Sequence, residues 1–321
     1  MPGCRVSNRF AKQWAREHYL RRRRDGVAIK GILYTPTETA AFIEAARRVA
    51  CLRTDFQGPE CLMVGDSYLT THLGRSTTHL PTPEDMAWFQ DLSCGLLAGV
   101  DKMLDQLAPP RVYLLADLPD GSAESPSRAL TCAQRFLSAG ADAVKLEIEG
   151  ETGLRCLEVL AHKGISVHAH IGFLPQKAEK RRRGLSVADC RCLAGLARAV
   201  RDAGADALVL EMVSRALNER LSIYHPRGLP VYSIFSGSAP GGGQSLNVWD
   251  AVVRPSFKAR LFPPTATIDR AQVPEAYHLN LLIDSLQELM ALTLDGRFPP
   301  PLREKWSPAE LEALARLEPW A

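Results

Sequence analysis

Residues 139–147 read Ala-Gly-Ala-Asp-Ala-Val-Lys-Leu-Glu, the sequence of a helix end, a glycine stop and a short buried strand. Side chains alternate between the two faces of a strand, so Val144 and Leu146 point one way and Lys145 and Glu147 the other. A cation and a carboxylate at the end of an apolar strand are costly to bury unless they are paired or bind something. This stretch therefore predicts a strand whose C-terminal end has a chemical role.

The same pattern occurs at three other places in the chain. In each, an apolar strand ends in an acidic residue; the segments are residues 203–211, a helix end and a strand that closes on Glu211, 62–65 with Asp66 followed by Ser67, and 112–116 with Asp117. Four strands of this kind, with helices between them, are typical of a barrel of parallel strands whose C-terminal rim carries the chemistry.

Helix-start signals alternate with apolar strands along most of the chain. A Ser or Thr cap, followed by Pro or by an acidic residue, predicts helix starts near residues 36, 83, 126, 187 and 308. Further strands are predicted at residues 27–34, 111–116, 143–147, 166–170, 207–211 and 230–234, and an eighth near 246–248. At least seven strand–helix units imply a parallel sheet. We expect this α/β sheet to close into a (β/α)8 TIM barrel rather than to stay open.

The chain is expected to have three parts. Residues 1–25 form an N-terminal arm, residues 26–270 the barrel, and residues 271–321 a set of C-terminal helices. Residues 273–293 are apolar over most of a helical circumference, which predicts burial against either the barrel or another subunit. The run Arg21–Arg24 is expected to be solvated or to line an interface, with an anion site as the sharper alternative.

Composition narrows the class of protein. The 321 residues include 39 basic and 36 acidic side chains, a net charge of +3 that gives no general case for binding nucleic acid or membrane. We find no apolar run long enough to span a bilayer, and the polar, basic N-terminus is not a secretory signal. The eight cysteines are scattered in a chain too large to need disulfides, which indicates reduced thiols and a cytoplasmic protein. Cys190 and Cys192 lie two residues apart in a predicted helix and should face different ways.

Two loops differ from the rest of the barrel sequence. Residues 175–184 contain Lys177, Lys180 and three consecutive arginines, and residues 236–243 read Ser-Gly-Ser-Ala-Pro-Gly-Gly-Gly after the seventh strand. The glycine-rich loop lies where barrels often hold a phosphate, although a plain flexible lid is an equal alternative. It lacks the Gly-Lys-Ser/Thr ending of a nucleotide-binding loop.

The strand ends bring together residues suited to metal-assisted acid–base chemistry. Three carboxylates without matching Cys or His ligands favour a hard divalent cation, and we expect Mg²⁺ at Asp66, Asp117 and Glu147. Each acid alone has a simpler interpretation, since an Asp at a strand end often caps the next helix. Lys145 is suited to hold a substrate carboxylate or an enolate oxygen, and Glu211, on a separate strand, is the candidate general base. His170 either hydrogen-bonds to the substrate or its surroundings or has a structural role.

At these residues the chain resembles the ketopantoate hydroxymethyltransferases. The matching segments are Met63-Val64-Gly65-Asp66-Ser67, Leu73–Pro81, Leu115-Ala116-Asp117-Leu118-Pro119, Val144-Lys145-Leu146-Glu147, His170-Ile171-Gly172-Phe173-Leu174-Pro175-Gln176 and Leu208-Val209-Leu210-Glu211. They lie in the family's order and span roughly residues 60–250. Together they are specific, although no single segment is.

The resemblance implies a (β/α)8 barrel of the phosphoenolpyruvate mutase/isocitrate lyase superfamily and an oligomeric protein. It implies Mg²⁺ near Asp66, Asp117 and Glu147, and a 2-oxo acid bound by Asp66, Ser67, Asp117 and Lys145, with Glu211 as proton acceptor. The family enolises 3-methyl-2-oxobutanoate and adds a one-carbon unit from 5,10-methylenetetrahydrofolate.

This sequence departs from the family pattern in three segments. The first strand reads Lys30-Gly31-Ile32-Leu33-Tyr34-Thr35 in place of Thr-Ala-Tyr-Asp, the basic run 177–184 replaces a Gly-Tyr-Lys-Val-Gln-Gly-Arg loop, and residues 233–238 replace Ile-Gly-Ile-Gly-Ala-Gly. We therefore expect the enolising chemistry to be kept and the 2-oxo acid to differ. A folate-independent C–C lyase or aldolase of the same superfamily and a non-catalytic paralogue are the alternatives.

Overall fold

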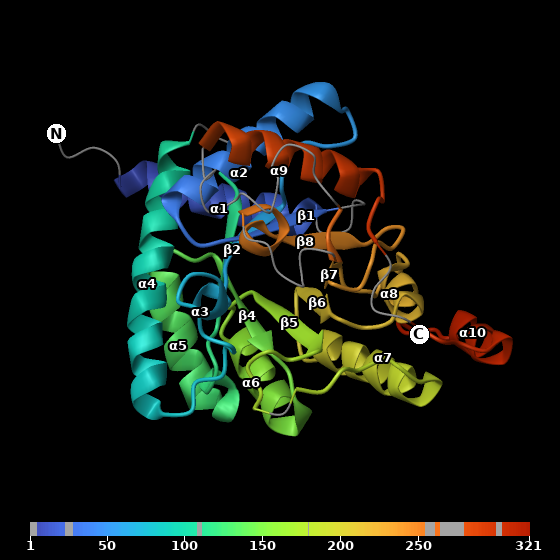
Figure 1. The fold of residues 1–321 in the computed structure, drawn as a ribbon. Coiled ribbons are helices and arrows are strands. Elements are labelled where there is room, and N and C mark those ends of the chain that lie inside the picture. The colour runs from blue at the N-terminus through green and yellow to red at the C-terminus, as the bar shows by residue number, and fades with distance from the viewer. Residues whose placement is uncertain are drawn as a thin grey trace.

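Eight parallel strands close into a barrel in the order of the chain in this computed structural model (Figure 1). The structure describes residues 5–22, 28–107, 111–178, 180–253, 261–263, 279–299 and 304–321, with the backbone alone at 5–9 and 22. The strands are β1 (Ile29–Leu33), β2 (Cys61–Val64), β3 (Tyr113–Asp117), β4 (Ala143–Glu147), β5 (Val167–Gly172), β6 (Ala207–Glu211), β7 (Val231–Ile234) and β8 (Gly243–Asn247). β8 pairs with β1, with Lys30 opposite Ser245, so the sheet has no free edge. The predicted TIM barrel is confirmed.

The eighth strand begins at Gly243 rather than near residue 246. Its sequence, Gly-Gln-Ser-Leu-Asn, contains a single large apolar side chain. Hydrophobic patterning alone therefore predicts only the C-terminal end of this strand. The strand is nevertheless buried along its whole length, because it closes the barrel between β7 and β1.

Helices surround the barrel and follow the strands (Figure 1). They are α2 (Pro36–Leu52), α3 (Tyr68–Thr71), α4 (Pro83–Gln106), α5 (Pro126–Ser138), α6 (Gly150–His162), α7 (Val187–Asp202), α8 (Arg215–Ser222), α9 (Leu279–Leu294) and α10 (Pro308–Ala315), with short turns η1 (Ser122–Glu124) and η2 (Trp249–Val253). The five predicted helix starts are confirmed, and at each the Ser or Thr side chain accepts a hydrogen bond from the backbone N–H three residues later. Capping of this kind fixes where each helix begins relative to the preceding strand.

Helix α1 (Arg5–Arg22) closes the N-terminal end of the barrel. Lys12 Nζ donates to Asp101 and to the carbonyl of Gly140, and Arg16 donates to the carbonyl of Gly164, both carbonyls lying just before a strand. Tyr19 is buried and its ring stacks on Tyr113 with centroids 4.3 Å apart. The arm thus packs on the barrel, while Arg21 is solvated and residues 23–25 lie outside the described residues.

Tyr19 also reaches His168 inside the barrel, and we expect this contact to be a measurable part of stability. Its hydroxyl shares a hydrogen bond of 2.6 Å with His168 Nε2. Tyr19→Phe leaves the buried ring nitrogen without a partner and should lower the free energy of unfolding by about 1–2 kcal/mol in a urea titration. Tyr224→Phe, at a side chain that is 66% exposed, is the matched control and should change it by less than about 0.5 kcal/mol. Equal losses in both variants would contradict a role for this contact.

Helix α9 packs along α2 on the outside of the barrel (Figure 1). Its buried side chains, which include Leu282, Leu286 and Leu289, join the main hydrophobic core, and Arg48 of α2 forms an ion pair with Asp284. Helix α9 therefore packs against the barrel within this chain. Residues 273–278 of the predicted helix lie outside the described residues.

Two further features concern the cysteines and the helices. All seven cysteines in the described ranges are free, and Cys190 is buried whereas Cys192 is exposed. Across those same ranges, no helix combines the length and the apolar character needed to cross a membrane.

The glycine-rich loop after β7 is packed rather than open. The side-chain amide of Asn218 donates to the carbonyls of Ser236 and Gly237, and Gln244 Nε2 donates to the carbonyl of Gly237. Ser236 and Ala239 are buried. The loop is thus tied to α8 and β8, which does not fit the expectation of a plain flexible lid.

Candidate active site

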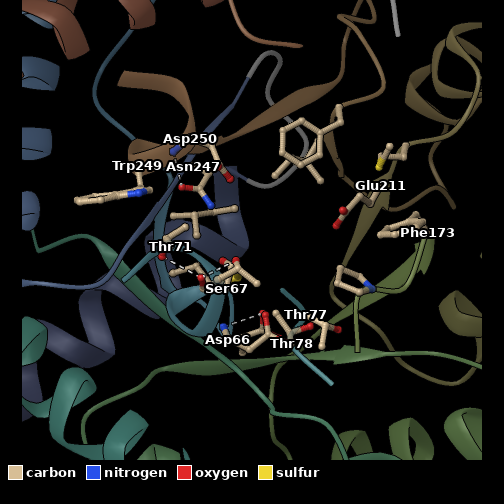
Figure 2. Close-up of a pocket in the computed structure, with 18 of the residues that line it drawn as sticks. Asp66, Ser67, Thr71, Thr77, Thr78, Phe173, Glu211, Asn247, Trp249 and Asp250 are labelled. Atoms are coloured by element: carbon tan, nitrogen blue, oxygen red, sulfur yellow. Dashed lines mark hydrogen bonds between the residues drawn. The ribbon is translucent and has the colours of Figure 1, made fainter. Parts of the chain in front are cut away.

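A cavity of about 490 Å³ lies at the C-terminal ends of the strands (Figure 2). Residues on the eight strands, or directly after them, line it. In Figure 2, Asp66 and Ser67 lie on one side of the cavity, and the Glu211 side chain points toward it from the other side, next to Phe173. The predicted residues Asp66, Ser67, Asp117, Lys145 and Glu211 all line this cavity, whereas Glu147 and His170 lie behind its wall.

Lys145 and Asp117 form a buried ion pair in the wall of the cavity. Lys145 Nζ lies 2.7 Å from Asp117 Oδ2, and neither residue is more than 5% exposed. Burial raises the pKa of Asp117 and the nearby Asp66 carboxylate raises it further, while Lys145 acts in the opposite direction. Burial alone would lower the pKa of Lys145, but Asp117, Asp66 and Glu147 together raise it above its ordinary value. Lys145 is therefore a cation held by three nearby carboxylates.

Gln176 connects two of the carboxylates, and the sequence prediction gave it no role. Its Nε2 donates to Asp66 Oδ2 at 2.9 Å and to the carbonyl of Leu118 at 2.8 Å. Its backbone N–H lies 3.3 Å from both Glu147 carboxylate oxygens. Because Asp66 accepts from Gln176 and α3 has no side-chain cap, Asp66 is not the helix cap of the simpler interpretation. The signal for Gln176 was its place in the matched segment that ends Pro175-Gln176.

His170 lies between two carboxylates beneath the cavity. Its Nδ1 is 3.7 Å from Glu147 Oε1, and its Nε2 is 3.4 Å from Glu211 Oε2. Burial lowers the pKa of His170 well below its ordinary value, and Lys145 and Lys30 lower it further. The ring is therefore neutral, and it lies next to Glu211 without lining the cavity.

Two residues with left-handed backbone conformations hold the end of β6. Met212, directly after Glu211, has φ of 50°, and Gly172, the neighbour of Glu211 across the sheet, has φ of 102°. A Cβ at Gly172 would lie 2.5 Å from the carbonyl oxygen of Glu211, which accepts a hydrogen bond from Phe173 N–H at 2.9 Å. The close approach of these two backbones requires glycine at residue 172.

Gly172→Ala should therefore disturb both stability and the placement of Glu211. The strained φ and the contact with the Glu211 carbonyl should lower the free energy of unfolding by about 1–3 kcal/mol, measured by denaturant titration. Gly195→Ala is the control, because its Cβ meets no atom closer than 3.9 Å within helix α7. That variant should be neutral or more stable, by up to about 1 kcal/mol. A Gly172→Ala protein as stable as the wild type would contradict the predicted crowding.

The carboxylates of Asp66, Asp117 and Glu147 are the kind of ligand that a hard cation prefers, although they do not enclose a cation by themselves. Among the described residues, no group of three or more His, Cys, Asp or Glu side chains is arranged to hold a metal ion alone. Asp117 Oδ1 is buried and accepts no hydrogen bond from this part of the chain, and burial raises the pKa of Glu147 well above its ordinary value. Mg²⁺ commonly binds through one or two carboxylates and keeps water or substrate oxygens as its other ligands. The residues present therefore fit such an ion.

Polar and aromatic groups that the sequence prediction did not single out lie on the same side of the cavity as Ser67 (Figure 2). Tyr34 hydroxyl lies 2.7 Å from Ser67 Oγ and accepts from the side-chain amide of Asn247 at 3.0 Å. Trp249 and Asp250 follow directly after β8 and also line the cavity (Figure 2). These residues follow a strand that hydrophobic patterning defines poorly, so their convergence needed the structure.

Comparison with known proteins gives a consistent assignment. Residues 41–268 match the model of the family described as ketopantoate hydroxymethyltransferase. The chain is 36% identical over 200 residues to the 3-methyl-2-oxobutanoate hydroxymethyltransferase of Streptomyces coelicolor A3(2), a match that covers 61% of this chain and 63% of that protein. It is 32% identical over 254 residues to the enzyme of the same name from Thiobacillus denitrificans, covering 76% and 86% of the two chains.

The chain thus matches slightly less than two thirds of the length of the Streptomyces protein. A solved structure of oxaloacetate acetylhydrolase with the inhibitor 3,3-difluorooxalacetate superposes with a TM-score of 0.50 and 16% identity over 89% of this chain and 96% of that one, which shows a shared fold alone. From the family match over residues 41–268, the chain belongs to the ketopantoate hydroxymethyltransferase family.

Proposed function

We propose that this protein is a Mg²⁺-dependent hydroxymethyltransferase that enolises a 2-oxo acid and adds a one-carbon unit from 5,10-methylenetetrahydrofolate. The candidate acids are 3-methyl-2-oxobutanoate, the substrate in the names of its relatives, and related 2-oxo acids. The observation that carries the proposal is the convergence of Lys145, Asp66, Asp117 and Glu211 on one buried cavity.

Each residue has a distinct role in this proposal. Lys145, held by Asp117, binds the substrate carboxylate or the oxygen that gains charge on enolisation. Asp66, Asp117 and Glu147 would hold Mg²⁺, which when bound polarises the 2-oxo group and so lowers the cost of removing the C3 proton. Ser67 is positioned by Tyr34 to hydrogen-bond to the substrate.

Glu211 accepts the proton from C3. It lies across the cavity from Asp66 and Ser67, so a substrate held by those residues presents C3 toward it (Figure 2). The neutral His170 ring, 3.4 Å from its carboxylate, restricts where that carboxylate lies. Carbon C3 then forms the new C–C bond to the one-carbon unit, water supplies the hydroxyl group, and tetrahydrofolate leaves.

Product formation tests this reaction directly. The protein is incubated with Mg²⁺, 3-methyl-2-oxobutanoate and 5,10-methylenetetrahydrofolate labelled with ¹³C at the methylene carbon, and ¹³C NMR follows the label. A hydroxymethyl signal that needs protein, metal and acid supports the proposal. Metal-dependent consumption of 2-oxo acids without transfer of label would instead favour the folate-independent lyase or aldolase, and absence of both Mg²⁺ binding and turnover would favour a non-catalytic paralogue.

The proposal also includes the domain organisation, the cellular location and the oligomeric state. The chain is proposed to consist of an arm at 1–25, a barrel at 26–270 and C-terminal helices at 271–321. The free cysteines are consistent with a cytoplasmic protein. The protein is expected to act as a homo-oligomer, which light scattering at several concentrations would test.

A further inference from the structure

An unpaired cation lies at the floor of the cavity. Lys30 on β1 is fully buried and lines the cavity, yet its Nζ has no hydrogen-bond partner among the described residues. Ser245 lies opposite Lys30 on the neighbouring strand β8, and its buried Oγ also lacks a partner in this part of the chain. Because Asn247, two residues further along β8, lines the cavity, Ser245 faces the barrel interior as well.

The surroundings stabilise this ammonium group poorly. Its Nζ lies over the ring of Tyr232, 5.2 Å from the centroid. Burial lowers the pKa of Lys30 to about 8, and Lys145 contributes to the same shift, while Cys61, Asp117 and Glu211 act in the opposite direction. A buried cation is costly unless an anion or several hydrogen-bond acceptors compensate it, so the floor is incomplete without a further group.

We propose that Lys30 and Ser245 bind a second carboxylate of the substrate, so that the preferred substrates are 2-oxo dicarboxylic acids. This inference rests on the proposed enolisation at the same site and names its substrate class. The carboxylate next to the 2-oxo group would lie at Lys145, and the distal carboxylate would lie at the floor. The ammonium and hydroxyl groups together supply donors to both oxygens of a carboxylate.

The other side chains of the cavity explain why the floor is where a second anion is accepted. Of the cations that line the cavity, Lys145 is paired with Asp117 and Arg75 with Asp85, whereas Lys30 Nζ has no hydrogen-bond partner among the described residues. Ile32 and Met63 lie one layer nearer the mouth than Lys30, and the flexible Met63 side chain allows a distal group to pass. An apolar substrate end at the floor would leave Lys30 and Ser245 unpaired, which disfavours monoacids of the same length.

The test compares two acids of nearly the same shape. Deuterium exchange at C3 is followed by proton NMR, with Mg²⁺ present, for 2-oxoglutarate and for 5-methyl-2-oxohexanoate, which carries an isopropyl group in place of the distal carboxylate. The wild type should exchange the diacid with the higher kcat/KM. Lys30→Met, similar in length and neutral, should lower kcat/KM for the diacid about 10- to 150-fold, the range for hydrogen bonds to a charged group, and should not lower it for the monoacid. Ser245→Ala should have a smaller effect in the same direction.

Lys180→Met is the matched control. Lys180 lines the same cavity from the loop after β5, at an exposed position. Removing its charge should leave the ratio of diacid to monoacid kcat/KM unchanged. An equal fall in that ratio for Lys180→Met and Lys30→Met would overturn the floor as the binding place of the distal carboxylate.

A binding measurement separates this inference from the proposed reaction. 2-Oxoglutarate should raise the melting temperature of the wild type but not that of Lys30→Met, while the unliganded variant should melt at or above the wild-type temperature because a buried charge is gone. Stabilisation that depends on Lys30 supports the inference even if no acid exchanges, a result that would count against the proposed function alone. Exchange of monoacids with no preference for diacids, and no effect of Lys30→Met on either acid, would overturn the inference and leave the proposed function standing.

Discussion

Replacing Glu211 by Gln should lower the rate of C3 proton exchange about 1,000-fold or more, the range expected when a positioned general base is lost. Gln is close to Glu in size and keeps the contacts of the side chain, but it cannot accept the proton. Glu211 lies next to the neutral His170 ring and lines the cavity. The measurement is proton NMR of 3-methyl-2-oxobutanoate, and of the acid that exchanges fastest, in D₂O with Mg²⁺.

Mg²⁺ and substrate binding are the controls for this variant. Calorimetric titration of Glu211→Gln with Mg²⁺ should match the wild type, because the proposed ligands are Asp66, Asp117 and Glu147. A Glu211→Gln protein that exchanges at the wild-type rate would remove Glu211 from the role of base. Loss of metal binding together with exchange would assign Glu211 to the metal instead.

Replacing Lys145 by Met should have the second large effect, on both catalysis and stability. The variant loses the cation that lies 2.7 Å from Asp117 Oδ2 and is expected to bind the substrate. We expect kcat/KM for exchange to fall about 100-fold or more. Removing one partner of a buried ion pair typically costs about 3–5 kcal/mol, because the remaining charge stays buried.

The stability loss in Lys145→Met should depend on pH with a defined sign. Burial raises the pKa of Asp117 and Glu147 in the folded protein, so the folded state binds more protons than the unfolded state between their ordinary and raised values. Stability contributed by such groups is present at low pH and is lost as pH rises, so the loss should be larger near about pH 8 than near about pH 5. Lys177→Met is the control, since the Lys177–Glu149 pair is exposed and should contribute under about 1 kcal/mol. A pH-independent loss would contradict the role of Lys145 as counter-charge to these carboxylates.

The strand ends were predictable because local rules determine them. A glycine stop followed by an alternating strand fixed the direction of Lys145 relative to Leu146, and parallel strands then brought Asp66, Asp117 and Glu211 to one rim. Capping signals placed the helix starts for the same reason, since a cap needs only the residues of one turn.

The contacts that complete the site were not predictable from local patterns. Gln176 contacts Asp66 across 110 residues of sequence, and Tyr19 contacts His168 across 149. Neither contact can therefore be recognised from the local sequence pattern. From the sequence, the charged residue Lys30 in a short strand would be predicted to face solvent. In the structure it is buried, because the polar strand β8 closes the barrel beside it. Glu147, a predicted metal ligand, lies behind the backbone of Gln176. The position of that loop residue depends on tertiary packing.

The central claim is that this cavity removes a proton from C3 of a 2-oxo acid with the help of a divalent cation. The most direct test is deuterium incorporation at C3 of 3-methyl-2-oxobutanoate and a panel of straight-chain 2-oxo monoacids and diacids, measured in D₂O with Mg²⁺ and again with EDTA. The account predicts protein-dependent exchange for at least one acid, which EDTA stops and added Mg²⁺ restores. No exchange with any acid, in a protein shown by calorimetry to bind Mg²⁺, would contradict it.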